Sequence, residues 1–241
     1  MNAPMTSSLP ARAGGSLVRQ AMQAVTAHIR EQNLRVGDTV PGEGHFSASL
    51  GVSRAVMREA FGALAALKLI EVANGRRPRV AALDGSVIAA ALDHAVSTAQ
   101  VSVADVWDVR RTLEVRTASL AAQHRTDAEA DRLLALVDAM GRTVSDLGET
   151  TRHDTAFHQL IAEASRNALF HQIVSSFAPL MEVAIPTAWR TRETEDQRTT
   201  ILERHRAVAR AIADRDAAGA RLAMEAHFDA SIGHILAGLG D

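Results

Sequence analysis

Four side chains with metal-ligating chemistry stand at helical spacing in the second half of the chain. Asp154 and His158 lie four residues apart, so a helix projects both from one face, about one turn apart. His205 and His227 follow later, each among apolar residues that repeat at helical intervals. One carboxylate and three imidazoles that converge inside a helical domain suit a divalent transition metal ion such as zinc, nickel, copper or iron, and the carboxylate extends the range to manganese.

Spacing alone leaves a second interpretation of these residues open. The chain holds 10 histidines, and histidines that are scattered over several helices and held by ordinary hydrogen bonds explain the same pattern. Other catalytic or binding motifs are missing from the sequence, which contains no GxGxxG, GxxxxGK[ST], HExxH or GxSxG pattern. A Ser-His-Asp triad is not excluded, although no residue stands out as a nucleophile.

The elements that must position the four ligands are helices. From residue 86 onward apolar residues repeat at intervals of three and four, which predicts an all-helical bundle of six or seven helices. One such stripe is Val106, Val109, Leu113, Thr117 and Leu120. Ser102 with Asp105, and Thr126 with Glu129, have the spacing of capping boxes and predict two helix starts. Later helices are expected at about 150–165, 167–184, 195–214 and 217–238.

The composition agrees with a helical, soluble protein. The chain has 241 residues, of which 47 % are hydrophobic but only 3 % aromatic, so Ala, Leu, Val and Ile must fill the core. Without Cys there is no disulfide, no thiolate metal site and no cysteine nucleophile. No run approaches the roughly 18 to 20 apolar residues that cross a bilayer, and no signal peptide is evident. We therefore expect a cytoplasmic protein that does not act at a membrane.

The first part of the chain has a different pattern. Residues 1–16 are rich in Ala, Pro, Ser and Gly and are expected to form a flexible tail. Three helices are then predicted at 17–33, 43–50 and 54–67, with Gly51 ending the second and Ser53 capping the third. Short strands are expected at 69–72 and 79–82, joined by a tip with basic side chains at 74–78. Helix-turn-helix spacing followed by a basic hairpin predicts a winged helix.

Charge separates the two parts. Residues 1–82 carry ten basic and five acidic side chains, a net charge of +5, whereas the remainder carries −7, so the whole chain is at −2. A positive first part suits a polyanion such as DNA, and the negative second part suits another role. The predicted domains are therefore 17–83, which binds DNA, and 86–240, which forms the helical bundle, with the change near residues 83–86.

These residues also carry a family resemblance. The first domain resembles the winged helix of GntR-superfamily transcription regulators in its segments Leu34-x-x-Gly37-Asp38, Pro41-x-Glu43, Leu50-Gly51-Val52-Ser53-Arg54-x-x-x-Arg58-Glu59-Ala60 and Arg76-Arg77-Pro78-Arg79-Val80. The bundle resembles the C-terminal effector domain, FCD, of the FadR-type branch in its segments Val109-Arg110-x-x-Leu113-Glu114, Asp154-x-x-Phe157-His158, Ala164-Ser165-x-Asn167, the stretch from His205 to Ala211-Ile212, and Met224-x-x-His227. The resemblance covers nearly the whole chain past the tail.

For the first domain, the resemblance implies a surface that reads double-stranded DNA. The recognition helix would offer Ser53, Arg54 and Arg58, and the wing would offer Gly75, Arg76, Arg77 and Arg79. An Arg fork can meet guanine O6 and N7 together in the major groove, whereas wing arginines can approach the minor groove or phosphates. One departure stands out: the family usually has Pro-Ser-Glu-Arg where this chain has Pro41-Gly42-Glu43-Gly44, so one common DNA-contacting Arg is missing.

For the second domain, the resemblance places Asp154, His158, His205 and His227 on all four positions of the family's metal site. A divalent ion, with zinc preferred over nickel, manganese or iron, would then dock a small carboxylate effector such as a sugar acid or hydroxy acid. Arg110 and Asn167 are candidate effector-binding residues. The alternatives are an ion pair with Glu114 for Arg110 and a helix cap for Asn167.

The sequence thus predicts a ligand-responsive transcription regulator and not an enzyme. We expect a homodimer on a palindromic operator, with repression relieved by the effector as the usual habit of the family. One alternative is a metal-dependent enzyme acting on a small organic acid, which leaves the basic winged helix unexplained. Another is a constitutive DNA-binding protein whose bundle serves only to dimerise.

Overall fold

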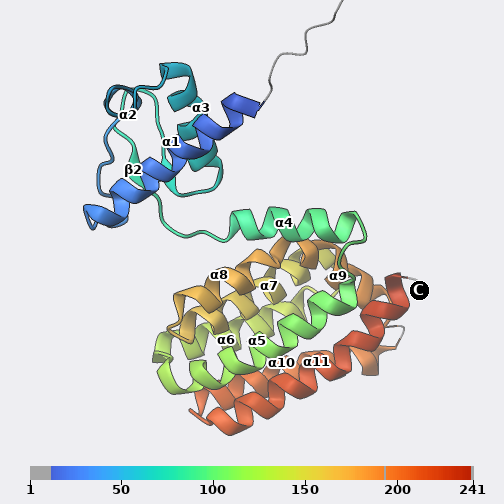
Figure 1. Ribbon diagram of the computed structural model, residues 1–241. Helices are drawn as coiled ribbons and strands as arrows, with labels where there is room; N and C mark the ends of the chain where they lie inside the picture. The colour runs from blue at the N-terminus through green and yellow to red at the C-terminus, as the bar shows by residue number, and fades with distance from the viewer. Residues whose placement is uncertain (1–11, 193, 240–241) are drawn as a thin grey trace, which may run out of the picture. The chain divides into compact units, whose positions relative to one another are not determined.

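The computed structural model describes residues 12–192 and 194–239, which fall into two compact units divided between Val87 and Ile88. Each unit has its own cluster of buried apolar residues. The fold class predicted from the sequence, a winged helix-turn-helix followed by an all-helical bundle, is confirmed (Figure 1).

The first unit consists of three helices and a two-stranded hairpin. In order these are α1 (Arg12–Glu31), α2 (Glu43–Leu50), α3 (Arg54–Ala66), β1 (Ile70–Glu71) and β2 (Arg79–Val80). The strands are antiparallel, with Ile70 opposite Val80 and Glu71 opposite Arg79, and Thr39 adds an isolated bridge to Arg79. Both strands are two residues long instead of four, although the Ala81 N–H still donates to the Leu69 carbonyl at 3.2 Å just beyond them.

Local signals fix the turn between α2 and α3. Gly51 ends α2 in the left-handed conformation, at φ 67°, which a residue without Cβ adopts freely. The Ser53 hydroxyl accepts a hydrogen bond from the Val56 N–H and caps α3. The buried face of α3 is Met57, Ala60, Phe61 and Leu64. Leu67, directly after α3, is 46 % exposed and lies outside this face.

The expected tail at residues 1–16 is wrong for residues 12–16, which already belong to α1. The helix is expected to start at residue 17 because the apolar pattern of this segment begins there. Backbone hydrogen bonds extend a helix past that point without apolar side chains. The rest of the expected tail, residues 1–11, lies outside the described residues.

The second unit contains eight helices within the described residues, instead of six or seven. They are α4 (Ser86–Ser97), α5 (Val103–His124), α6 (Asp127–Arg142), α7 (Leu147–Ala164), α8 (Ala168–Ser176), α9 (Ala178–Arg190), α10 (Glu195–Ala213) and α11 (Ala217–Leu239). The single helix expected at 167–184 is wrong: α8 and α9 meet at a 55° bend. Pro179 lies in the first turn of α9, where its missing N–H costs nothing, but it cannot continue the ladder of α8.

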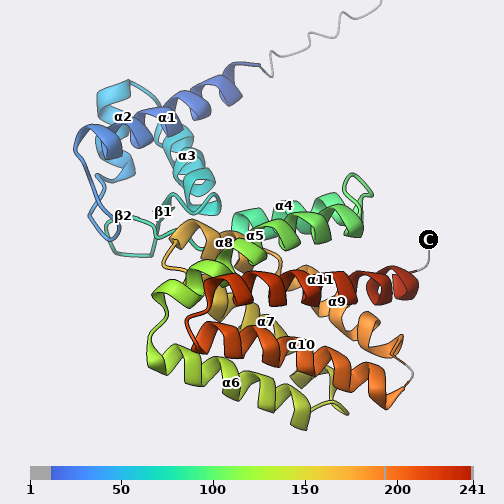
Figure 2. The same cartoon turned by 90° about the horizontal axis from the view of Figure 1, so that it is seen from below.

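Five long helices of this unit form a closed ring. Each of α5, α7, α6, α10 and α11 packs against the next in that order, and α11 returns to α5. Figures 1 and 2 show these helices side by side, with α9 lying against α11 and α7. Both predicted capping boxes, at Ser102 and at Thr126, are present. Polar residues that face the middle of the ring are thereby buried on all sides.

No single helix within residues 12–192 and 194–239 has both the length and the apolar character needed to span a membrane. Only α8 and α9 together, as a bent pair, reach that length and composition.

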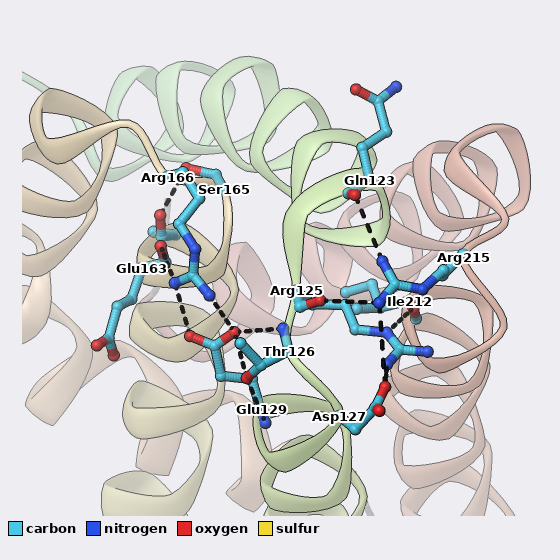
Figure 3. A network of polar contacts seen from close by, with 11 residues as sticks. Gln123, Arg125, Thr126, Asp127, Glu129, Glu163, Ser165, Arg166, Ile212 and Arg215 are labelled. Atoms are coloured by element: carbon cyan, nitrogen blue, oxygen red, sulfur yellow. Dashed lines mark hydrogen bonds and ion pairs between the residues drawn. The ribbon is translucent and has the colours of Figure 1, made fainter.

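A polar network joins the helix ends at one end of the ring (Figure 3). Arg166 follows α7 and has a left-handed backbone conformation, at φ 59°. Its guanidinium donates two hydrogen bonds, of 2.7 and 2.6 Å, to the Glu129 carboxylate. The same carboxylate accepts from the backbone N–H of Thr126, at 2.7 Å. Arg125 donates to the carbonyls of Ile212 and Ala213 at the end of α10. The network therefore ties α6 to α7, and the start of α6 to the end of α10.

This network predicts a loss of stability in acid. The hydrogen bonds from Arg166, together with those from Thr126, outweigh burial and lower the pKa of Glu129 to about 2. A carboxylate whose folded pKa is depressed stabilises the protein above its unfolded pKa of 4.5, and this contribution is lost as the pH falls toward 2. Since Arg166 is partly exposed, we expect Glu129→Gln to lower the free energy of unfolding by roughly 1–2 kcal/mol near pH 7.

Urea unfolding of both proteins between about pH 7 and pH 2.5 measures this difference. The gap between wild type and Glu129→Gln is expected to shrink as the pH falls, because Gln keeps the cap but not the charge. The exposed Glu203, on α10, supplies the control variant Glu203→Gln, for which no gap is expected. A gap for Glu129→Gln that stays constant over this range contradicts the assignment.

Candidate metal centre and nucleic-acid interface

The ring brings the four predicted ligands together. Asp154 and His158 come from α7, His205 from α10 and His227 from α11, and all four are buried. One ring nitrogen from each histidine lies within 4.8 Å of the others. Asp154 adjoins them, with its Oδ1 2.9 Å from His205 Nε2 and its Oδ2 3.9 Å from His158 Nε2. These three histidines are therefore clustered and not scattered.

Hydrogen bonds on the far side of two rings direct nitrogen lone pairs inward. His205 Nδ1 lies 2.9 Å from the carbonyl of Ile201, which can only accept, so Nδ1 carries the proton. His158 Nδ1 contacts the carboxylate of Glu114 in the same way. In the neutral rings, the two Nε2 atoms are then unprotonated and face the Asp154 carboxylate. Two Lewis bases 2.9 Å apart, His205 Nε2 and Asp154 Oδ1, call for a proton or a metal ion between them.

The third ring is held differently. His227 Nδ1 is the one fully buried side-chain nitrogen or oxygen without a hydrogen-bond partner among the described residues. Burial, followed by repulsion from His205 and His158, lowers the pKa of His227 well below its ordinary value, so this ring is neutral near pH 7. Burial opposes the charge on Asp154, yet the contact with His205 and the proximity of the other histidines outweigh it and lower the pKa of Asp154. A neutral imidazole and a carboxylate are the forms that bind metals.

A narrow cavity opens beside these ligands. It has about 30 Å³ of room for the centres of water-sized molecules, within about 340 Å³ of empty space. Two arginines line it: Arg110, from α5, and Arg192, which follows α9. Both are buried, at 3 % exposure each. The remaining lining residues are Trp107, Ile185, Ala188, Trp189, Ile201 and Ser231, next to Asp154 and the three histidines.

Arg110 forms the ion pair that the sequence offered as one alternative, and it also lines the cavity. Its guanidinium lines the cavity, and its Nε donates to Glu114 Oε1 at 2.7 Å. It also lies over the Trp107 ring, at 4.9 Å from the ring centre, and contacts the sulfur of Met181. Burial opposes the charge on Glu114, but Arg110 and His158 outweigh it and lower its pKa. Glu114 thus links the cavity arginine to a candidate metal ligand through one carboxylate.

Asn167 is placed elsewhere. Its Oδ1 accepts hydrogen bonds from the backbone N–H groups of Leu169, at 3.0 Å, and Phe170, at 3.3 Å, and so caps α8. The residue is exposed and is not part of the cavity lining. Its expected role in effector binding is therefore wrong for this structure, because its carbonyl oxygen already satisfies the first turn of α8.

In the first unit, the predicted DNA-contacting residues share an accessible surface. Arg54 and Arg58 are exposed, one helical turn apart on α3, while the opposite face of the helix packs on the core. Ser53 precedes them, but its hydroxyl serves as the helix cap. Without an acidic neighbour bonded to either guanidinium in the described structure, both side chains remain available to a base edge or a phosphate.

The wing presents Gly75, Arg76 and Arg77 at its tip. Gly75 has φ 71°, a left-handed conformation that favours glycine, and both arginines are exposed. Arg79 differs, since its Nη1 donates to the Gly37 carbonyl at 2.8 Å and braces the wing against the loop before α2. Of the four wing residues predicted from the sequence, Arg79 is thus already engaged inside the unit.

At residues 41–44, where this chain has glycines at two positions that usually carry Ser and Arg, the structure shows the effect on the start of α2. Gly42 is the N-cap of α2 and has no side chain to cap it. Gly44 is exposed, and a Cβ built there meets nothing within 4 Å, so the position has room for the Arg that is common in the family. Operator contacts from this helix must therefore come from other residues.

Together, a winged helix with exposed basic residues and a helical unit around a polar cavity define a class of protein, the DNA-binding transcription regulators with a separate effector domain. Comparisons with known proteins agree. Residues 17–80 match "Bacterial regulatory proteins, gntR family", and residues 105–230 match the "FCD domain". The chain belongs to the GntR family and carries an FCD domain.

Individual relatives agree with this membership. The chain is 32 % identical over 208 residues to the HTH-type transcriptional regulator LutR of Bacillus subtilis (strain 168), covering 83 % of this chain and 92 % of the relative. It is 27 % identical over 204 residues to the HTH-type transcriptional repressor NanR of Citrobacter rodentium (strain ICC168), covering 83 % and 78 %. These proteins are transcription regulators and not enzymes, so the enzyme alternative is set aside.

A solved structure shares the fold. Streptococcus agalactiae GntR superposes with a TM-score of 0.62 at 24 % identity, covering 88 % of this chain and 97 % of that one.

Proposed function

We propose that this regulator is a cytoplasmic, homodimeric repressor that binds a palindromic operator and releases it when a small carboxylate enters the metal-bearing cavity of its FCD domain. The observation that carries the proposal is the pairing of His205 Nε2 with Asp154 Oδ1 at 2.9 Å, while His205 Nδ1 is held by a backbone carbonyl. Repression is supported by the relative NanR, which is described as a repressor.

The residues fit a divalent ion. Asp154, His158, His205 and His227 would hold it, and the Nδ1 of His227 has no hydrogen-bond partner among the described residues. Three imidazoles with one carboxylate suit zinc, which we propose first, and also nickel, manganese or iron. When bound, the ion supplies a positive centre that attracts a carboxylate oxygen. Arg110 would orient the acid, while Glu114 holds both Arg110 and His158 in place.

Release of DNA follows from linkage. A ligand that binds one state of the FCD domain more tightly than another shifts the population toward that state. Coupling between the two sites of about 1–3 kcal/mol changes operator affinity by roughly 5- to 150-fold. The acid is expected to be a small carboxylate, with hydroxy acids and sugar acids as the first classes to test, because the cavity is narrow and lined by cations.

The test is operator binding measured by fluorescence anisotropy. DNA from the protein's own promoter region is titrated with zinc-loaded and with chelator-treated protein, each with and without a panel of small carboxylates. At least one acid should weaken binding by roughly 5-fold or more, and only with zinc-loaded protein. The double variant Asp154→Ala/His158→Ala should bind the operator and ignore the acid. Failure to bind that promoter DNA or any neighbouring one specifically, or an equal response by chelated protein, contradicts the proposal.

A further inference from the structure

Arg192 is a buried cation with no hydrogen bond or ion pair to an anionic group among the described residues. The residue is 3 % exposed and lines the cavity beside the metal-ligand cluster. No carboxylate or carbonyl within residues 12–192 and 194–239 accepts a hydrogen bond or forms an ion pair with its guanidinium, which lies 5.4 Å from the centre of the Trp189 ring. A buried charge is costly unless it is paired, so this arrangement calls for an anion from outside the described chain.

The other charged side chains that line the cavity have close neighbours. Arg110 pairs with Glu114 at 2.7 Å, and Asp154 Oδ1 lies 2.9 Å from His205 Nε2. Asp154 is also the charge that supports the protonated form of Arg192, although burial outweighs it and lowers the pKa of Arg192. Once Asp154 is shared with a divalent ion, that support weakens. The divalent ion, Arg192 and Asp154 then give the cavity a net charge of about +2, which a bound dianion would neutralise.

The residues that line the cavity also indicate that the ligand carries few hydroxyl groups. Ser231 is the one hydroxyl side chain that lines the cavity within the described residues, and it donates to the His227 carbonyl at 2.9 Å. Among the described residues the lining has no Asn or Gln, and apart from the two arginines, Asp154 and the three histidines its other side chains are Trp, Ile and Ala. A polyhydroxylated chain would leave its hydroxyl groups unpaired here, at a cost of about 1–3 kcal/mol for each buried group.

We propose that Arg192 is a specificity-determining residue that binds a second carboxylate of the effector, so that the effector is a compact dicarboxylate instead of a monocarboxylate or a sugar acid. The inference rests on the proposed function, since the first carboxylate takes the metal and Arg110. Arg192 adds a planar fork of donors, which matches a carboxylate with two hydrogen bonds.

The test uses matched acids that differ by one carboxylate: succinate against butyrate, and malonate against propionate. Zinc-loaded wild type, Arg192→Gln and Arg192→Lys are titrated by calorimetry, with metal content measured before and after. Wild type should bind a dicarboxylate about 30-fold or more tightly than its monocarboxylate partner, and Arg192→Gln should lose this preference without losing zinc. Arg192→Lys should keep part of it. The exposed Arg190, in the last turn of α9, supplies the control Arg190→Gln, which should behave as wild type.

The outcomes separate the two proposals. If neither kind of acid binds to zinc-loaded wild type, the proposed function fails, and this inference fails with it. If monocarboxylates bind as tightly as dicarboxylates, or if Arg192→Gln keeps the wild-type preference, the role of Arg192 is wrong while the metal-docking function stands. Unchanged melting of the unliganded variants shows that the fold is intact in each case.

Discussion

Replacing His227 by Ala is expected to abolish stoichiometric zinc binding. The imidazole of His227 is buried among the five helices. Its Nδ1 has no hydrogen-bond partner among the described residues, and its pKa lies well below the ordinary value. Loss of an outer-shell partner already costs roughly 10- to 100-fold in metal affinity, and loss of a ligand should exceed that. Wild type purified without chelators should therefore hold one zinc per chain, and His227→Ala should hold none.

The same change should remove the thermal effect of chelation. Metal at 100 times its Kd stabilises the folded state by about 2.7 kcal/mol, which for a chain of this length is a Tm increase of about 5 to 10 °C. Chelator should lower the Tm of wild type by this amount and leave that of His227→Ala unchanged. Asp154→Asn, which preserves the shape of the side chain, should show the same insensitivity if His227→Ala folds poorly.

His124 supplies the matched control. It is exposed at the end of α5, and His124→Ala should keep both the zinc and the chelator effect. Metal content is measured by atomic emission and Tm by circular dichroism. Wild type that holds no stoichiometric metal, and melts at the same temperature with zinc and with chelator, would show that the cluster is a hydrogen-bonded set of polar residues only.

Part of this site was predictable because helical spacing is rigid. Asp154 and His158 had to share a face, and both lie inside the ring. The convergence of His205 and His227 with them is a tertiary fact that no local pattern contains. Only the resemblance to FCD domains placed all four residues together before the structure did.

The apolar pattern did not predict which residues of α5 face the cavity. The stripe predicted for residues 103–124 contained Val109, which is 50 % exposed, whereas its neighbour Arg110 is 3 % exposed and Glu114 is 1 % exposed. The buried face of α5 holds the Arg110–Glu114 ion pair next to Val106 and Thr117 of the predicted stripe, so hydrophobic periodicity gives this face only in part. Functional sites are where local rules and the native structure are expected to disagree.

Arg192 had no signal in the sequence at all. It lies in an Arg-rich stretch beyond the end of α9, next to the exposed Arg190, and its composition is that of a surface segment. The winged helix was easier to predict, since Gly51, Ser53 and Gly75 act through local backbone geometry.

The second large effect is expected on the DNA side, from Arg58→Ala. Arg58 stands on the exposed face of α3, one turn after Arg54, and its side chain makes no ion pair in the described structure. An Arg that reads a guanine in the major groove contributes about 1–3 kcal/mol, and a two-fold symmetric dimer carries the change in both half-sites. Operator affinity should then fall by roughly 2–6 kcal/mol, with little change in binding to unrelated DNA.

A wing residue should behave differently from Arg58, and this difference identifies base reading. Arg77, exposed at the wing tip, is expected to contact phosphate, so Arg77→Ala should weaken specific and non-specific binding alike and reduce the salt dependence by about one ion for each protomer. Arg30, exposed on α1, supplies the control variant Arg30→Ala. If Arg58→Ala weakens operator and unrelated DNA equally, Arg58 binds phosphate. Sequence recognition must then be assigned to Arg54 or the wing, because Gly44 offers no side chain for it.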